Sequence, residues 1–241
     1  MKFINYLKYF YFIGTNWNFK LAFFTLYYEI KGEGKYHINT IKIDRLHHTE
    51  IKSHNLSHSS IYQATNYFLI EKAFEYLKSE KANNNLIDFG SGKGRVMAVA
   101  AWYGFKNVTG IDFAQQLCDE AEKNIEKIKP FFPESNFNII CDDAVNYKIE
   151  NNTNVFFFFN PFDEVIMLKV AKNILLSLKE KDRKIYIVYA NPLHKEIFQS
   201  AGFEEEYYLM KMEYLELSIL SHEPAPIKKP SPFLRWLLEV F

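Results

Sequence analysis

Short apolar runs alternate with longer segments whose apolar residues recur at helical spacing through the middle of the chain. Val96, Ala100 and Tyr103 lie on one face of such a segment, and Gly104 follows it as a typical helix end. The pattern predicts strands over 86–89, 107–112, 137–141, 155–159 and 185–189, and helices over 96–103, 117–128, 164–178 and 192–200.

Two further patterns specify the sheet. The run 155–159 is apolar without alternation, which is typical of a central parallel strand covered on both faces. The region 204–220 alternates as two β-segments with no helix between them, which predicts an antiparallel edge strand. We therefore expect an α/β, doubly wound, mostly parallel seven-stranded sheet of Rossmann-like type, whose ligands bind at the carboxyl ends of the strands.

The two ends of the chain differ from this middle region, 58–221. Residues 1–57 are rich in aromatic residues and predict an N-terminal helical cap, with a lid, a substrate-docking segment or a membrane-surface helix as alternatives. Residues 222–241 form a Pro-rich linker and a short apolar helix that docks on this protein or on a copy of it. The terminal segments could therefore support an oligomer.

Composition narrows the function. Lys+Arg and Asp+Glu both number 29, and a formal net charge of zero does not support general nucleic-acid binding. No apolar run approaches the roughly 18 residues that span a bilayer, so we expect a soluble, cytoplasmic protein without a transmembrane segment. Cys118 and Cys141 are isolated in sequence and predict neither a disulfide framework nor a metal site.

The strongest chemical signal follows the first predicted strand, where Asp88 precedes Gly90, Gly92 and Gly94. Glycines permit a tight turn and a close ligand approach at a helix N-terminus, which can bind a carboxylate. Arg95 stands where the dinucleotide fingerprint requires glycine, so the loop favours a ligand with adenosyl and amino-acid parts and no pyrophosphate. The alternative is a glycine-rich turn that binds nothing.

Acidic residues end the next two strands. Asp112 lies 22 residues after Gly90, where a carboxylate can accept both ribose hydroxyls or cap a helix starting at Phe113. Asp142 and Asp143 follow the third strand, where an acid can accept from the adenine amine. Which of the two points inward stays open, and both could be solvated turn residues.

The turn after the fourth predicted strand lies at the expected reaction centre. The Asn160 carbonyl could accept from a substrate amine and aim its lone pair, and Phe162 could offer a π-face to a developing cation. In the alternative reading, Asn160 and Pro161 simply turn the chain.

Together, the DFGSGKG loop, Asp112 and Asp142 resemble the class I S-adenosylmethionine (SAM)-dependent methyltransferases over roughly 58–221. The resemblance implies SAM as cofactor, with Gly90, Gly92 and Asp112 in contact with it, and Asp142 or Asp143 near the adenine.

Two motifs resemble amino-group methyltransferases. Residues 60–65 are similar to the loop that closes over SAM in lysine methyltransferases of the Dot1 and ATP-synthase-c-subunit type, where Tyr62 matches a tyrosine near the methionine end. The triplet 160–162 looks like the NPPY motif without its second proline.

The sequence thus predicts methyl transfer to a nitrogen nucleophile, either a protein lysine or a small amine. A non-catalytic nucleotide-fold binding protein is the alternative, and Arg95 disfavours a nicotinamide-dependent oxidoreductase. No metal is expected, because no nearby Glu or Cys completes a site with the histidines, which could instead border the cleft: His47, His48, His54 and His58.

Overall fold

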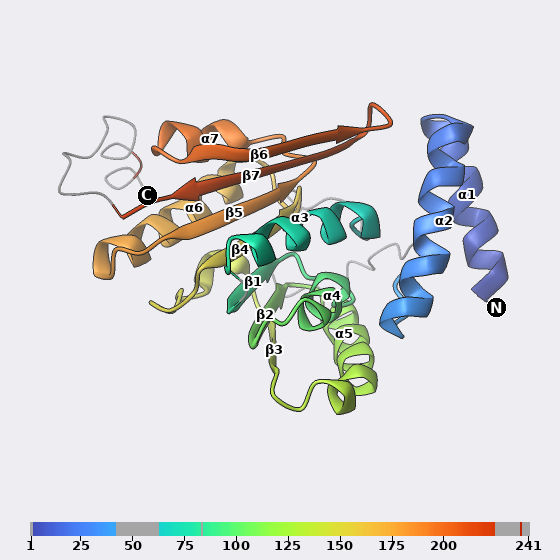
Figure 1. Ribbon diagram of the computed structural model, residues 1–241, viewed down its shortest axis with the longest axis horizontal. Helices are drawn as coiled ribbons and strands as arrows, with labels where there is room; N and C mark the ends of the chain where they lie inside the picture. Colours follow the sequence, from blue (N-terminus) through green and yellow to red (C-terminus); the bar gives the residue numbers. More distant parts are fainter. Residues whose placement is uncertain (1, 42–62, 83, 225–236, 238–241) are drawn as a thin grey trace.

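Seven strands form one sheet in the order β3-β2-β1-β4-β5-β7-β6, with helices on both faces (Figure 1). The computed structural model describes residues 2–41, 63–82, 84–224 and 237. The strands are β1 (Asn85–Phe89), β2 (Asn107–Asp112), β3 (Asn136–Cys141), β4 (Val155–Phe159), β5 (Ile185–Ala190), β6 (Glu204–Lys211) and β7 (Leu215–His222).

Strands β1 to β5 pair in parallel, whereas β7 pairs antiparallel with both β5 and β6. This arrangement confirms the mostly parallel sheet with an antiparallel edge pair. Because β4 lies between β1 and β5, both of its faces are covered by helices, and Phe156, Phe157 and Phe158 are fully buried. The unbroken apolar run in the sequence is the consequence of this central position.

Helices divide between the two faces of the sheet. The first apolar cluster packs β residues against α3, α4 and α5, and the second packs the opposite face against α6 and α7. The helices are α1 (Lys2–Asn16), α2 (Phe19–Tyr36), α3 (Tyr67–Ser79), α4 (Arg95–Trp102), α5 (Gln115–Ile128), α6 (Glu164–Glu180) and α7 (Lys195–Ser200), with short 3-10 turns η3 (Lys129–Phe131) and η4 (Ala144–Asn146).

The predicted N-terminal cap is the antiparallel pair α1–α2, at one end of the molecule in Figure 1. The Asn18 side chain caps α2 by accepting from the backbone N–H of Leu21. Inner residues of the pair form a third apolar cluster, which Met212 and Leu215 at the tip of the β6–β7 hairpin also join. The cap therefore stands over the same end of the sheet as this hairpin.

Helix starts differ from the sequence expectations at three places. Helix α3, which the strand and helix pattern above did not include, begins after Asn66, whose side chain accepts from the N–H of Phe68. Helix α5 begins at Gln115 rather than Phe113. Helix α7 begins at Lys195 rather than at 192, because the N–H of Leu193 instead closes a turn onto the carbonyl of Asn191.

Leu237 is the residue of the C-terminal segment that the structure describes, and it is buried in the second cluster. Of the helices in the described ranges, none combines the length and the apolar character needed to cross a bilayer.

Candidate functional site

Three glycines with left-handed backbone bend the loop between β1 and α4: φ is 76° at Gly90, 52° at Gly92 and 75° at Gly94. A Cβ on Gly90 would lie 2.6 Å from the Cβ of Pro161, so no other residue fits against the turn that follows β4. The N–H groups of Gly90 and Ser91 both donate to the carbonyl of Ile111. The loop is thus folded back over the ends of β1 and β2.

Asp112, at the end of β2, holds this loop. Its Oδ2 accepts from the N–H of Gly92 at 2.9 Å, and its Oδ1 accepts from the N–H of Ala114 at 3.0 Å. A carboxylate oxygen can accept more than one hydrogen bond, so both oxygens keep capacity for the hydroxyl groups of a ligand. The side chain that was predicted to bind ribose therefore also fixes the shape of the glycine loop.

Asp88 and Asp112 place two buried carboxyl groups under the loop. Burial raises the pKa of Asp88 well above its usual range, and repulsion from Asp112 raises it further. Burial also raises the pKa of Asp112 to about 6, although the N–H groups of Ala114 and Gly92 oppose the shift. A bound cation would offset the electrostatic cost of burying these two carboxylates.

The two acids after β3 lie in different environments. Asp143 is partly buried and caps η4, with its Oδ1 accepting from the N–H of Val145. Asp142 is exposed, and its Oδ1 accepts from Asp143 N–H and the Asn146 amide. Both side chains are thus oriented by hydrogen bonds, and Asp143 is the more buried of the pair.

Asn160 follows β4 in a left-handed conformation, with φ of 41°. Its Oδ1 is buried and has no hydrogen-bond partner among the described residues. Phe162 packs against the second apolar cluster, whereas the aromatic ring of Phe159 lines a cavity on the other side of the turn.

Sequence analysis did not single out Asn191, which repeats this arrangement on the next strand. Phe159 of β4 is in register with Ala190 of β5, so Asn160 and Asn191 are the next residues at two adjacent strand ends. Asn191 also has a left-handed backbone, with φ of 51°. The signal that could have revealed it is the second Asn-Pro pair, at 191–192, one residue beyond the predicted strand 185–189.

A cavity of about 250 Å³ lies over the carboxyl ends of β4 and β5. The α1–α2 pair and the β6–β7 hairpin form its walls, and Gln63, Ala64 and Asn66 border it. Its lining combines aromatic rings with polar groups, among them Tyr9, Trp17, Thr25, Gln63, Asn66, Phe159, Asn191, Glu213 and Tyr214. Most of these residues are distant in sequence, and their convergence could not be read from the sequence.

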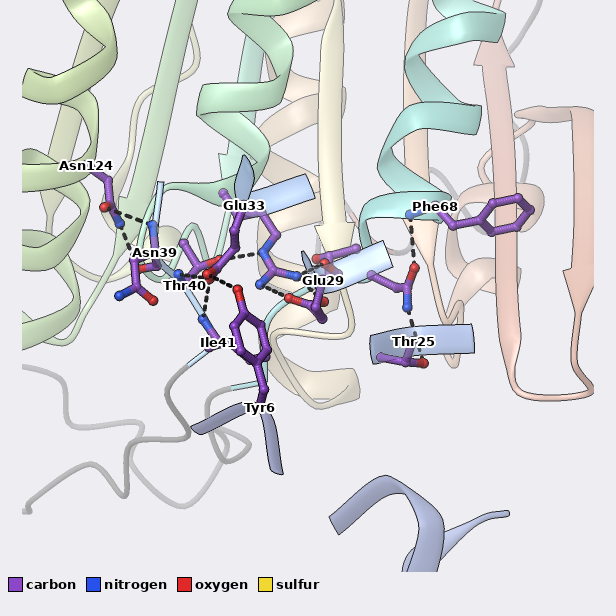
Figure 2. Close-up of polar contacts among 12 residues, drawn as sticks. Tyr6, Thr25, Glu29, Glu33, Asn39, Thr40, Ile41, Phe68 and Asn124 are labelled. Carbon is purple, nitrogen blue, oxygen red and sulfur yellow. Dashed lines mark hydrogen bonds and ion pairs between the residues drawn. The ribbon is translucent and has the colours of Figure 1, made fainter. Parts of the chain in front are cut away.

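Arg95, the first residue of α4, anchors the cap to the glycine loop through Glu29, whose contacts are drawn in Figure 2. Its guanidinium binds both carboxylate oxygens of Glu29 on α2, at 2.7 and 2.6 Å. It also donates to the Thr40 hydroxyl and the Thr65 carbonyl, and it stacks 4.1 Å from the centre of the Tyr67 ring. The residue that excluded a dinucleotide loop thus connects α2 to the start of α4.

Residues 87–180 match the family model described as "Methyltransferase domain". This range runs from β1 to the end of α6 and contains the glycine loop, Asp112 and Asn160. These residues form a methyltransferase domain. The match supports the class I SAM-dependent family that the sequence resembles, with SAM as the methyl donor.

Solved structures support the fold of this methyltransferase. PH1948 from Pyrococcus horikoshii, described as a candidate RNA methyltransferase, is 15% identical with a TM-score of 0.52, covering 80% of this chain and 94% of PH1948. YhhF from Escherichia coli, described as a candidate methyltransferase, is 14% identical with a TM-score of 0.51, covering 68% of this chain and 91% of its own. No curated protein matches the chain in sequence.

The residues at the loop fit SAM. Among the described residues, two buried side-chain oxygens without a hydrogen-bond partner lie at the glycine loop: Asp88 Oδ2 and Ser91 Oγ. SAM carries an ammonium group and hydroxyl groups that can donate to such oxygens. The start of α4 has no side-chain cap, so its N–H groups suit the methionine carboxylate.

Some predicted residues lie outside the described residues, namely Tyr62 and the four histidines between 47 and 58. Within the described ranges, no group of three His, Cys, Asp or Glu side chains could hold a metal ion. Cys118 and Cys141 are both free thiols; burial and then the neighbouring Cys141 raise the pKa of Cys118.

Asp112→Ala is expected to weaken SAM binding about thirtyfold, equivalent to about 2 kcal/mol of lost hydrogen bonding. Because Asp112 also accepts from Gly92 and Ala114, the ligand-free variant should be less stable at acidic pH, where the buried carboxyl group is uncharged. Isothermal titration with SAM measures the first effect, and thermal unfolding measures the second. Asp119→Ala, an exposed acid on α5, is the control, and an unchanged dissociation constant for Asp112→Ala would remove this residue from the site.

SAM affinity should also fall as the pH drops below about 6, since protonation removes an acceptor from Asp112. Isothermal titrations from about pH 5 to pH 8 should show the dissociation constant rising up to about tenfold per unit of pH below the pKa.

The stability of the ligand-free protein should respond in the opposite direction. The raised pKa of Asp112 favours the protonated folded state, so its contribution is largest below about pH 4 and is lost as the pH rises through about 6. Asp88 shifts in the same direction. Comparison with Asp112→Ala isolates the contribution of Asp112 to stability. If this contribution and the SAM affinity changed with pH in the same direction, Asp112 would not be the group that binds SAM.

Proposed function

We propose that this methyltransferase transfers the methyl group of SAM to an amine nitrogen, on a protein lysine or a small amine. The observation that carries the proposal is Asn160: its Oδ1 is buried, lacks a partner among the described residues and stands at the carboxyl end of β4. An amide oxygen is an acceptor that an N–H group can satisfy.

The cavity over β4 and β5 suits the acceptor. Its volume of about 250 Å³ is small, which favours a slender group such as an alkylamine arm over a fused ring system. The rings of Trp17, Phe159 and Tyr214 can contact the methylene groups of such an arm and stabilise a methylated cation. Glu213 adds an acidic group at its edge.

We assign the donor end to residues around the glycine loop. Gly90, Gly92 and Gly94 would bring backbone against SAM, and Asp88 would accept from its ammonium group. Asp112 would accept from the ribose hydroxyls. Asp143 is favoured over Asp142 as the acceptor for the adenine amine, because it is the more buried of the two acids.

Tyr62 and Phe162 keep proposed roles. Tyr62 would lie near the methionine end, as its resemblance to the lysine methyltransferase loop implies, and the described residues that follow it, Gln63 and Ala64, line the cavity. Phe162 would support the Asn160 turn from the second apolar cluster, which makes a direct π-contact with the substrate the weaker of its two roles.

SAM supplies an electrophilic methyl group when it is bound. Asn160 would accept one N–H of the neutral amine and so aim its lone pair, which is mainly an orientational contribution. Pro161, which follows Asn160, packs against Gly90, so the turn after β4 lies next to the glycine loop. The walls formed by α1–α2 and the β6–β7 hairpin would exclude water from the acceptor.

The proposal is tested by incubating the protein with tritium-labelled SAM and a cell lysate depleted of endogenous SAM. Label is expected in protein or small molecules, in an acid- and base-stable form that co-elutes with N-methylated amine standards. Label that is released by mild base, as from an ester, or that is removed by nuclease, would contradict an amine acceptor.

A further inference from the structure

The outer surface of the α1–α2 pair is covered by large apolar side chains. Phe3, Leu7 and Tyr11 recur every four residues along α1, and Phe19, Phe23 and Tyr27 do so along α2. They are far from buried: the exposed fraction is 72% for Phe3 and 65% for Phe23. We call these two stripes the outer face.

The outer face is continuous across the two helices. Phe10 of α1 lies between the stripes, with its ring centre 4.9 Å from that of Phe23 and 5.9 Å from that of Phe19. The inner sides of the same helices already pack, through Tyr9, Ile13 and Leu21 among others, onto each other and the β6–β7 hairpin. The inner contacts therefore hold the two helices in place, and the side chains of the outer face are not needed for this.

The exposed charges on this pair of helices are all positive. Lys8, Lys20 and Lys31 are exposed beside the stripes. The two acids, Glu29 and Glu33, are 0% and 5% exposed and face inward. Glu29 pairs with Arg95, and Glu33 accepts from Tyr6 and from the backbone of Thr40 and Ile41 (Figure 2). At the exposed positions of α1 and α2 that the structure describes, every charged side chain is thus a lysine.

We propose that the outer face binds the surface of an anionic lipid bilayer, so that the enzyme acts as a peripheral membrane protein. Aromatic and aliphatic side chains insert at the level of the headgroups, and flanking lysines are attracted to acidic lipids. The inference is independent of which acceptor the active site methylates.

The same charge pattern disfavours a second copy of the chain as the occupant. Two outer faces brought together would place lysine against lysine without an exposed carboxylate from either helix. The C-terminal segment is also disfavoured as the occupant. Its described residue, Leu237, is buried in the second cluster, on the face of α6 and α7.

Sedimentation of the full chain with vesicles tests the proposal. We expect binding to vesicles of phosphatidylcholine with phosphatidylglycerol and little binding to phosphatidylcholine alone. Leu7→Ser combined with Phe23→Ser should weaken binding at least about tenfold, because each removes a side chain worth that much when buried. Leu176→Ser is the matched control: Leu176 on α6 is 40% exposed, as Leu7 is 41%, but lies on the opposite face of the sheet.

The electrostatic part is tested separately. Lys8→Glu combined with Lys20→Glu should weaken binding to the anionic vesicles by at least about tenfold, and added salt should do the same. Lys123→Glu, on the exposed side of α5, should leave binding unchanged. Circular dichroism and SAM titration confirm that each variant is folded.

Three results would overturn the proposal. The first is no binding to either vesicle. The second is equal binding to both that ignores the lysine changes. The third is a dimer in light scattering that Phe23→Ser converts to a monomer, which would assign the outer face to a second copy.

Discussion

Arg95→Ala is expected to lower the free energy of unfolding by about 3–5 kcal/mol. The substitution leaves Glu29 buried without the guanidinium that binds both of its oxygens. Burial already raises the pKa of Glu29, and the charge of Arg95 opposes that shift. Chemical denaturation at neutral pH, followed by circular dichroism, measures the loss.

The loss should reach beyond the ion pair. Arg95 also donates to Thr40 and to the carbonyl of Thr65, both in the chain that leads from α2 to α3. Since Arg95 begins α4 directly after Gly94, its removal should also loosen the loop that meets SAM. We therefore expect weaker SAM binding alongside lower stability.

Two further variants show whether the loss of stability comes from leaving Glu29 buried and unpaired or from removing any charged side chain. Glu29→Leu combined with Arg95→Met should be more stable than Arg95→Ala, because no unpaired charge remains. Lys123→Ala, which breaks an exposed pair with Glu120 on α5, should cost less than about 1 kcal/mol. If Arg95→Ala were as mild as Lys123→Ala, the network in Figure 2 would not hold the cap on the methyltransferase domain.

Asn160→Gly is expected to reduce methyl transfer about a hundredfold while SAM affinity changes little. Glycine removes the amide oxygen that we assign to the acceptor amine. It also tolerates the left-handed backbone at this position, so the change should not destabilise the turn before Pro161. The measurement is the initial rate of tritium transfer from labelled SAM to the acceptor fraction, with SAM affinity determined by isothermal titration.

Asn160→Ala and Asn146→Ala complete this experiment. Alanine removes the same amide but strains the backbone, so a greater loss of stability in Asn160→Ala than in Asn160→Gly isolates the cost of φ at 41°. Asn146, an exposed amide on η4, should be replaceable without loss of rate. Undiminished transfer by Asn160→Gly would show that the acceptor is oriented by another group, for which Asn191 is the nearest counterpart on β5.

Most of the sheet was predictable because hydrophobic burial leaves a direct mark on local sequence. The bounds predicted for β2 and β4 agree with the structure, and those of the other parallel strands differ by single residues. Helix starts were less predictable. The first residues of α5 and α7 depend on which backbone N–H groups neighbouring turns satisfy, and those turns are fixed by residues such as Asn191 and Asp112.

The SAM-binding end and the acceptor-binding end of the site also differ in how far the sequence could predict them. The donor end is built from consecutive residues after β1 and from the ends of β2 and β3, which parallel pairing brings to one edge. The acceptor cavity draws Trp17, Asn66 and Tyr214 from segments with no shared pattern. Its composition is decided by how α1–α2 and the β6–β7 hairpin pack, which is a long-range outcome.

Sequence alone determined the parallel sheet, the glycine loop and the choice of SAM over a dinucleotide, because strand burial, left-handed turns and the Arg95 position are local requirements. Only the tertiary structure revealed what Arg95 is for, since its partner Glu29 lies on a helix that is remote in sequence. It also decided that the aromatic N-terminal residues divide into an inner side, buried against the hairpin, and an outer face that stays exposed. A helical periodicity predicts that such sides exist, but which side meets the rest of the protein depends on what packs against it.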